Sequence, residues 1–119
     1  MLNLDTHVVV ALLDGSLDRE ELARLSVEPI AISAIVLWEL AKLVQLNRLK
    51  LDFDCLEFGE FLRQVTIIPI NMEIARKSTE LDVRSDPADE IIAATSIVER
   101  IPLVTRDKKL LKSKMIPFR

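Results

Sequence analysis

The 119-residue sequence has few of the residue types on which several common functional sites depend. Its only histidine is His7 and its only cysteine is Cys55, which excludes an internal disulfide and an ordinary zinc site. The only glycines are Gly15 and Gly59, which excludes a Walker loop and a GxGxxG dinucleotide fingerprint. A single unpaired cysteine is typical of a reducing compartment, and we therefore expect a cytoplasmic protein.

Long apolar runs are also absent. The longest wholly apolar run, residues 8–13, is far shorter than the roughly 20 residues that span a bilayer. No basic region precedes an apolar stretch at the N-terminus, so we expect neither a signal peptide nor a membrane partner. With 119 residues, 50% of them hydrophobic, the chain is expected to form one domain over residues 1–119 with a generous core.

The charge of the chain is unevenly distributed. The net charge is −3, yet residues 100–119 hold seven basic side chains and one acid, which gives +6 there and −9 elsewhere. A basic segment of this kind favours a polyanionic partner. A solvated helix face without any partner explains the same pattern equally well.

Short apolar segments alternate with helical patterns along the chain. The apolar segments predict strands at residues 2–5, 29–33, 66–70, 102–105 and 115–117, the third of them buried on both faces. The helical patterns predict helices at residues 7–13, 18–25, 34–46, 53–64, 72–81, 87–100 and 107–112. Such alternation predicts an α/β fold, specifically a three-layer α/β/α sandwich with a mainly parallel sheet of about four to five strands.

Four acidic residues from distant segments are expected at one edge of this sheet. They are Asp5 at the end of the first strand, Glu39 about two turns into the helix after the second, Asp89 in the first turn of the helix over residues 87–100, and Asp107 just after the fourth strand. Ligands of parallel α/β sheets bind outside the carboxyl ends of the strands. Clustered carboxylates repel one another, and a bound divalent cation relieves this repulsion. Oxygen-only ligands favour Mg²⁺ or Mn²⁺.

Each of these acids also has a purely local explanation. Asp5, Asp89 and Asp107 could each help to cap a helix. Glu39 could pair with Lys42, which lies close by on the same helix. For the helix that carries Asp89 we expect Asp86 to be the N-cap, because a proline follows it at the first helical position.

A carboxylate-bound cation suits the hydrolysis of phosphodiester bonds. Such an ion lowers the pKa of a bound water, holds a phosphate oxygen and neutralises charge that develops during an in-line displacement. Three basic residues near the acids, Arg84, Arg106 and Lys108, are expected to hold flanking phosphates of the substrate.

The segments around the four acids resemble the four acidic motifs of PIN-domain ribonucleases, in particular those of bacterial VapC-type toxins. These segments are residues 2–7, 33–40, 86–95 and 103–107, and their order and spacing match over essentially the whole chain. The resemblance implies a PIN fold in which all four acids hold Mg²⁺ or Mn²⁺. It also matches Thr105 to a small polar residue that helps to hold metal or water.

The resemblance further implies an endoribonuclease toxin that cleaves RNA, often tRNA or rRNA. It implies a VapB-like antitoxin whose C-terminal segment lies over the active site, and a homodimer. One position departs from the pattern: Glu90 directly follows the third acid, where close relatives often carry arginine. His7 and Trp38 match the pattern, and we interpret both mainly as packing residues, with Trp38 also able to border the antitoxin groove.

Two other functions are compatible with an α/β sheet of this kind. A non-catalytic module with a PIN fold would dock a protein partner, but a degenerate copy has no reason to keep four mutually repelling acids. A receiver domain would be phosphorylated on Asp5. Such domains usually have paired acids near the first strand, and no second acid stands beside Asp5.

Overall fold

Four short parallel strands form the centre of the molecule. The computed structural model describes residues 1–119, and its sheet has the order β3-β2-β1-β4 with every neighbouring pair parallel. The strands are β1 (Leu2–Leu4), β2 (Ile30–Ser33), β3 (Thr66–Ile68) and β4 (Leu103–Val104). The helices are α1 (Thr6–Asp14), α2 (Arg19–Leu25), α3 (Ala34–Gln45), α4 (Leu56–Gln64), α5 (Met72–Ser78), α6 (Pro87–Glu99) and the 3₁₀ helix η1 (Leu110–Lys112).

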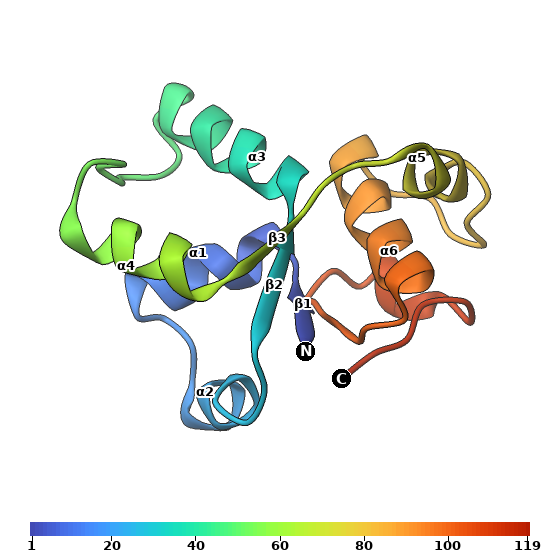
Figure 1. The fold of residues 1–119 in the computed structure, drawn as a ribbon, viewed down its shortest axis with the longest axis horizontal. Coiled ribbons are helices and arrows are strands. Elements are labelled where there is room, and N and C mark those ends of the chain that lie inside the picture. The colour runs from blue at the N-terminus through green and yellow to red at the C-terminus, as the bar shows by residue number, and fades with distance from the viewer.

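Helices cover both faces of the sheet, which confirms the predicted three-layer α/β/α sandwich. Figure 1 shows α1 and α4 on one side of the strands and α5 and α6 on the other. Side chains alternate between the faces of a strand. Ile32 accordingly belongs to the larger buried cluster, with Val9 of α1 and Phe58 of α4. Its neighbour Ala31 belongs to a second cluster on the α5–α6 side. No helix combines the length and apolar character needed to cross a bilayer.

A buried polar residue fastens β1 to α6. Asn3 is fully buried, and its Nδ2 donates to the Ile92 carbonyl at 3.1 Å and to Ser96 Oγ at 2.9 Å. Ala93 and Ala94 are small enough to let α6 approach the sheet closely, and both are fully buried. These contacts hold α6 against β1, so the start of the helix lies beside the carboxyl edge of the sheet.

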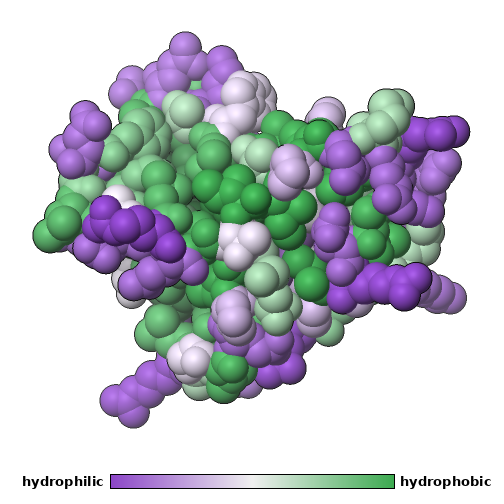
Figure 2. Space-filling model, in the orientation of Figure 1, coloured by the Kyte–Doolittle hydropathy of each residue, from purple (hydrophilic) through white to green (hydrophobic).

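Two predictions about strands are wrong. Residues 115–117 form no strand, and the C-terminal segment meets the sheet only through one parallel bridge between Leu103 and Phe118. The third strand ends at Ile68, and it is not buried on both faces, because β3 is an edge strand whose Thr66 and Ile67 are exposed. In the view of Figure 2, apolar surface occupies the centre of the molecule, where β3 crosses in Figure 1.

Three helices are shorter than the sequence pattern indicates. α4 begins at Leu56 instead of residue 53, because residues 52–55 form a turn in which the carbonyl of Asp52 accepts the backbone N–H of Cys55. α5 ends at Ser78 instead of residue 81, where the Thr79 hydroxyl donates to the carbonyl of Arg76. The predicted helix over residues 107–112 is reduced to the single 3₁₀ turn of η1.

Candidate active site

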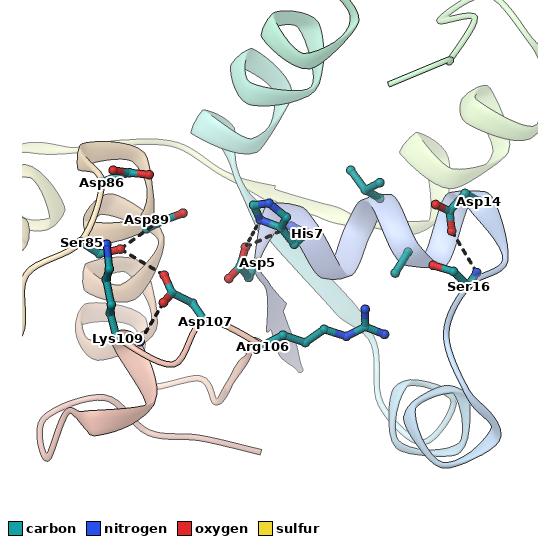
Figure 3. A pocket seen from close by; sticks show the side chains of 12 residues that line it. Asp5, His7, Asp14, Ser16, Ser85, Asp86, Asp89, Arg106, Asp107 and Lys109 are labelled. Atoms are coloured by element: carbon teal, nitrogen blue, oxygen red, sulfur yellow. Dashed lines mark hydrogen bonds and ion pairs between the residues drawn. The ribbon is translucent and has the colours of Figure 1, made fainter. Parts of the chain in front are cut away.

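The carboxyl edge of the sheet opens into a cavity of about 490 Å³ (Figure 3). Five of the twelve residues that line it are aspartates: Asp5, Asp14, Asp86, Asp89 and Asp107. β1 leads into Asp5, α6 carries Asp89, and the segment after β4 carries Asp107. Three of the four predicted acids therefore share one cavity.

Asp5 is buried at the end of β1 and uses both of its oxygens. Oδ1 accepts the backbone N–H of His7 at 3.1 Å, which caps α1, and Oδ2 accepts the hydroxyl of Thr105. Burial alone would raise the pKa of Asp5, but the hydrogen bonds from His7 and Thr105 together outweigh it and lower the pKa below its ordinary value. Asp5 is therefore ionised at neutral pH, and it is both a helix cap and a member of the acid cluster.

The hydroxyl of Ser85 lies between the other two aspartates. Its Oγ is 3.2 Å from Asp89 Oδ2 and 3.1 Å from Asp107 Oδ2. Asp107 Oδ1 accepts the backbone N–H of Lys109 at 2.8 Å, and the backbone N–H of Asp107 donates to Thr105 Oγ1 at 3.0 Å. Two hydroxyls thus connect acids from three separate segments. Sequence reasoning gave Ser85 no role, since only the fold brings Asp107 to it.

The residue that departs from the family pattern holds this serine in place. Glu90 Oε2 accepts the backbone N–H of Ser85 at 3.2 Å. Asp86 occupies the N-cap position of α6, but its side chain makes no capping hydrogen bond and lines the cavity instead. Asp86 is therefore the N-cap residue, as predicted, but the prediction that its side-chain oxygen accepts a backbone N–H of the first turn is wrong.

Glu39 stands apart from the cavity lining but acts on it electrostatically. Its carboxylate accepts the hydroxyl of Thr6, while Lys42 donates to Gln45 at 2.8 Å, so the ion pair with Lys42 does not form. Burial, followed by repulsion from Asp5, raises the pKa of Glu39.

Asp89 has the most perturbed carboxyl of the site. Burial, and then the negative charges of Asp5 and Glu39, raise its pKa from 3.8 to about 6. The four acids therefore feel one another's charge, and their donors are all oxygens, which fits Mg²⁺ or Mn²⁺. No group of three or more acidic, histidine or cysteine side chains is placed to hold one ion together. The donor chemistry fits, while hydroxyls occupy the space between the carboxylates.

The basic residues divide into two groups. Arg106 lines the cavity, but its Nε and Nη2 donate to the carboxylate of Glu21 at 2.8 and 2.6 Å. Lys109, which the sequence reasoning missed, also lines the cavity. Arg84 and Lys108 are exposed and do not line it. The sequence alone does not show which of several neighbouring basic residues faces the site.

His7 and Trp38 are not packing residues. The His7 side chain is 76% exposed and lines the cavity, with Nδ1 3.9 Å from Asp5 Oδ1. The nearby Asp5 carboxylate raises the pKa of His7, although partial burial of the ring acts in the opposite direction. Trp38 is 54% exposed, and Lys42 Nζ lies 5.9 Å from the centre of its ring. His7 therefore faces the cavity, and Trp38 faces solvent from α3.

Known structures share this fold. A chain of a toxin–antitoxin complex from Klebsiella pneumoniae is 26% identical with a TM-score of 0.71, and the match covers 94% of this chain and 91% of that one. A chain of VapBC2 from Rickettsia felis, bound to a promoter DNA fragment, is 23% identical with a TM-score of 0.71, covering 100% and 98%. A chain of FitAcB from Neisseria gonorrhoeae is 21% identical with a TM-score of 0.72, covering 100% and 97%. No curated protein matches in sequence.

The two likenesses below 25% identity establish the fold alone. The family assignment comes from the sequence itself, because the family model described as PIN domain matches residues 3–114. That match includes all four acids and nearly the whole chain. Because the family model covers most of the chain and the structure has the α/β architecture of that fold, the chain belongs to the PIN-domain family.

Proposed function

We propose that this chain is a Mg²⁺- or Mn²⁺-dependent endoribonuclease and the toxin of a type II toxin–antitoxin pair. The observation that carries the proposal is the meeting of Asp5, Asp89 and Asp107 in one cavity at the carboxyl edge of a parallel sheet, with Glu39 within electrostatic reach. The similar solved chains come from complexes described as toxin–antitoxin and VapBC. This similarity supports a VapB-like antitoxin as the partner.

The proposed roles of the acids follow from their environments. Asp5 is ionised and fixed by its bonds to His7 and Thr105, which suits a permanent metal ligand. Asp89 and Asp107 are oriented by Ser85, and Oδ1 of Asp89 has no hydrogen-bond partner in the cavity that the two residues line. A bound Mg²⁺ or Mn²⁺ would supply an activated water and a contact to a phosphate oxygen. Thr105 is proposed to position Asp5, and Lys109 to attract the phosphate.

RNA, either tRNA or rRNA, is the proposed substrate. The +6 charge of residues 100–119 supports a polyanion, and this segment brings Lys109 to the cavity. We further propose that the antitoxin covers this cavity and that the chain forms a homodimer. The exposed apolar side chains of Ile67 in the edge strand β3 and of Ile70 just after it are compatible with a protein interface on this side of the sheet.

The test is RNA cleavage by the purified chain with Mg²⁺ or Mn²⁺. Asp5→Asn and Asp89→Asn should each abolish cleavage while circular dichroism and thermal unfolding show a folded protein. The matched control is Asp54→Asn, which neutralises an exposed acid outside the cavity and should cleave normally. Cleavage that survives both site substitutions and excess EDTA would contradict the proposal.

Calorimetric titration with Mn²⁺ separates the proposal from its strongest alternative. A nuclease of this type should bind Mn²⁺, and Asp89→Asn should weaken the binding. Absence of binding at millimolar Mn²⁺ would favour a non-catalytic PIN module that docks a protein.

A further inference from the structure

The cavity extends beyond the acid cluster along α1. Its far end is formed by Asp14 and Ser16 at the turn that ends α1, with Val10 and Ala11 as the only apolar residues of the lining. Figure 3 shows the Arg106 side chain reaching from the acid cluster toward Asp14 and Ser16. Lys109 lies on the opposite, α6 side of the acids. The proposed cleavage chemistry gives this far end no role.

At this end of the cavity Glu21 holds the guanidinium of Arg106 by one edge. Its Nε and Nη2 both donate to Glu21, which therefore occupies one of the two edges through which arginine can bind a phosphate with a pair of hydrogen bonds. Because the N–H groups lie in the plane of the guanidinium, these two hydrogen bonds engage its edge and not its faces. The side chain is 46% exposed and lines both this cavity and a neighbouring one of about 200 Å³.

Glu21 is itself held in one position. Its backbone N–H donates to Asp18 Oδ1 at 2.8 Å, and its Oε1 accepts the backbone N–H of Asp18 at 3.1 Å, which forms a capping box at the start of α2. The hydrogen bonds that Arg106 donates to Glu21, together with the charges of Glu21, Asp18 and Asp14, raise the pKa of Arg106. These negative charges repel a phosphate, but they do not repel a neutral group.

We propose that this end of the cavity takes an unpaired RNA base, which stacks on the guanidinium of Arg106 beside the site of cleavage. The inference rests on the proposed function. Proteins commonly read single-stranded RNA by stacking bases on aromatic rings or arginine planes. No Phe or Trp lines the cavity. Asp14 Oδ1 accepts the backbone N–H of Ser16 at 2.9 Å, and its other oxygen is available to an amino group of the base.

The test is the affinity for short, fluorescently labelled single-stranded RNAs of mixed sequence, measured by anisotropy in the Asp89→Asn background so that no cleavage occurs. Arg106→Lys keeps the charge and removes the planar face, and it should lower the affinity about ten-fold without changing its salt dependence. Glu21→Gln keeps an acceptor for the capping box but offers Arg106 one oxygen instead of two, and it should weaken binding several-fold. Glu20→Gln makes the same charge change beside it and should not weaken binding.

A phosphate contact by Arg106 predicts the opposite pattern. Arg106→Lys would then bind almost as well as the parent, and Glu21→Gln would bind more tightly because the fork is freed. Arg106→Ala would reduce the slope of log affinity against log salt by about 0.7. Any of these results, or no RNA binding by the parent, overturns the stacking. Cleavage by the unsubstituted protein is measured separately. If that protein cleaves RNA while Arg106→Lys does not change the RNA affinity, the base site is refuted and the proposed nuclease function is not.

Discussion

Replacing Asp89 with asparagine is expected to stabilise the metal-free protein at neutral pH, although Asp89 is a proposed metal ligand. The Asp89 side chain is buried, and burial followed by the charges of Asp5 and Glu39 raises its pKa from 3.8 to about 6. Asparagine has nearly the same shape, carries no charge and can still accept the Ser85 hydroxyl. The substitution therefore removes the repulsion and keeps the hydrogen bond.

The magnitude follows from linkage between protonation and folding. A carboxyl whose pKa is raised in the folded state stabilises the fold fully below 3.8, and this contribution is lost as the pH rises through about 6. The difference corresponds to about 3 kcal/mol at neutral pH. For a domain of this size, 1 kcal/mol shifts Tm by about 4 °C, so the Tm of Asp89→Asn should exceed that of the parent by about 12 °C.

The assay is urea and thermal unfolding in EDTA across the acidic and neutral range. The curves of the parent and Asp89→Asn should converge at low pH, where both side chains are neutral, and separate as the pH rises through about 6. Asp86→Asn is the matched control, because Asp86 is exposed at the N-cap of the same helix and its side chain makes no capping bond. An Asp89→Asn variant that is no more stable at neutral pH, or a gap that does not change with pH, would refute the reasoning.

Three further predictions concern stability. Glu39→Gln should also stabilise the metal-free protein at neutral pH but not in acid, because burial and then Asp5 raise the pKa of Glu39; pH-dependent urea unfolding checks this. Asn3→Ala should cost about 2 kcal/mol in urea unfolding, since it removes two buried hydrogen bonds between β1 and α6. Gly15→Ala should destabilise by about 1 kcal/mol because Gly15 has φ of 77°, whereas Gly59→Ala within α4 should stabilise by a similar amount; equal signs would contradict this.

The edge at which the acids meet could be predicted from the sequence because it depends on local signals. Asp5 directly follows an apolar strand, and Asp89 falls in the first turn of a helix that Pro87 starts. In a parallel sheet the carboxyl ends of strands lie together, so the strand pattern alone places Asp5 and Asp107 at one edge. The strand lengths were less predictable, because burial of β3 depends on its position at the edge and not on its composition.

The orientations of the polar side chains could not be predicted in this way. Arg106 and Glu21 are 85 residues apart, and no local sequence pattern predicts that they pair. The same holds for Ser85, whose contact with Asp107 spans 22 residues. A sequence shows which groups carry charge and which segment holds them. The direction in which each group points is set by partners that only the folded chain supplies.

The hydroxyls of Ser85 and Thr105 connect the stability of the fold to the proposed metal site. Ser85 lies between Asp89 and Asp107, and the hydroxyl of Thr105 donates to one oxygen of Asp5. A cation that draws these oxygens together must displace at least the Ser85 contact. In return it relieves the repulsion between the carboxylates, which contributes to the raised pKa of Asp89. Because Asp89 is strained electrostatically only when ionised, Mn²⁺ should raise the Tm of the parent more at neutral pH than in acid, and it should raise that of Asp89→Asn less. An equal rise in both proteins would remove Asp89 from the ligand set.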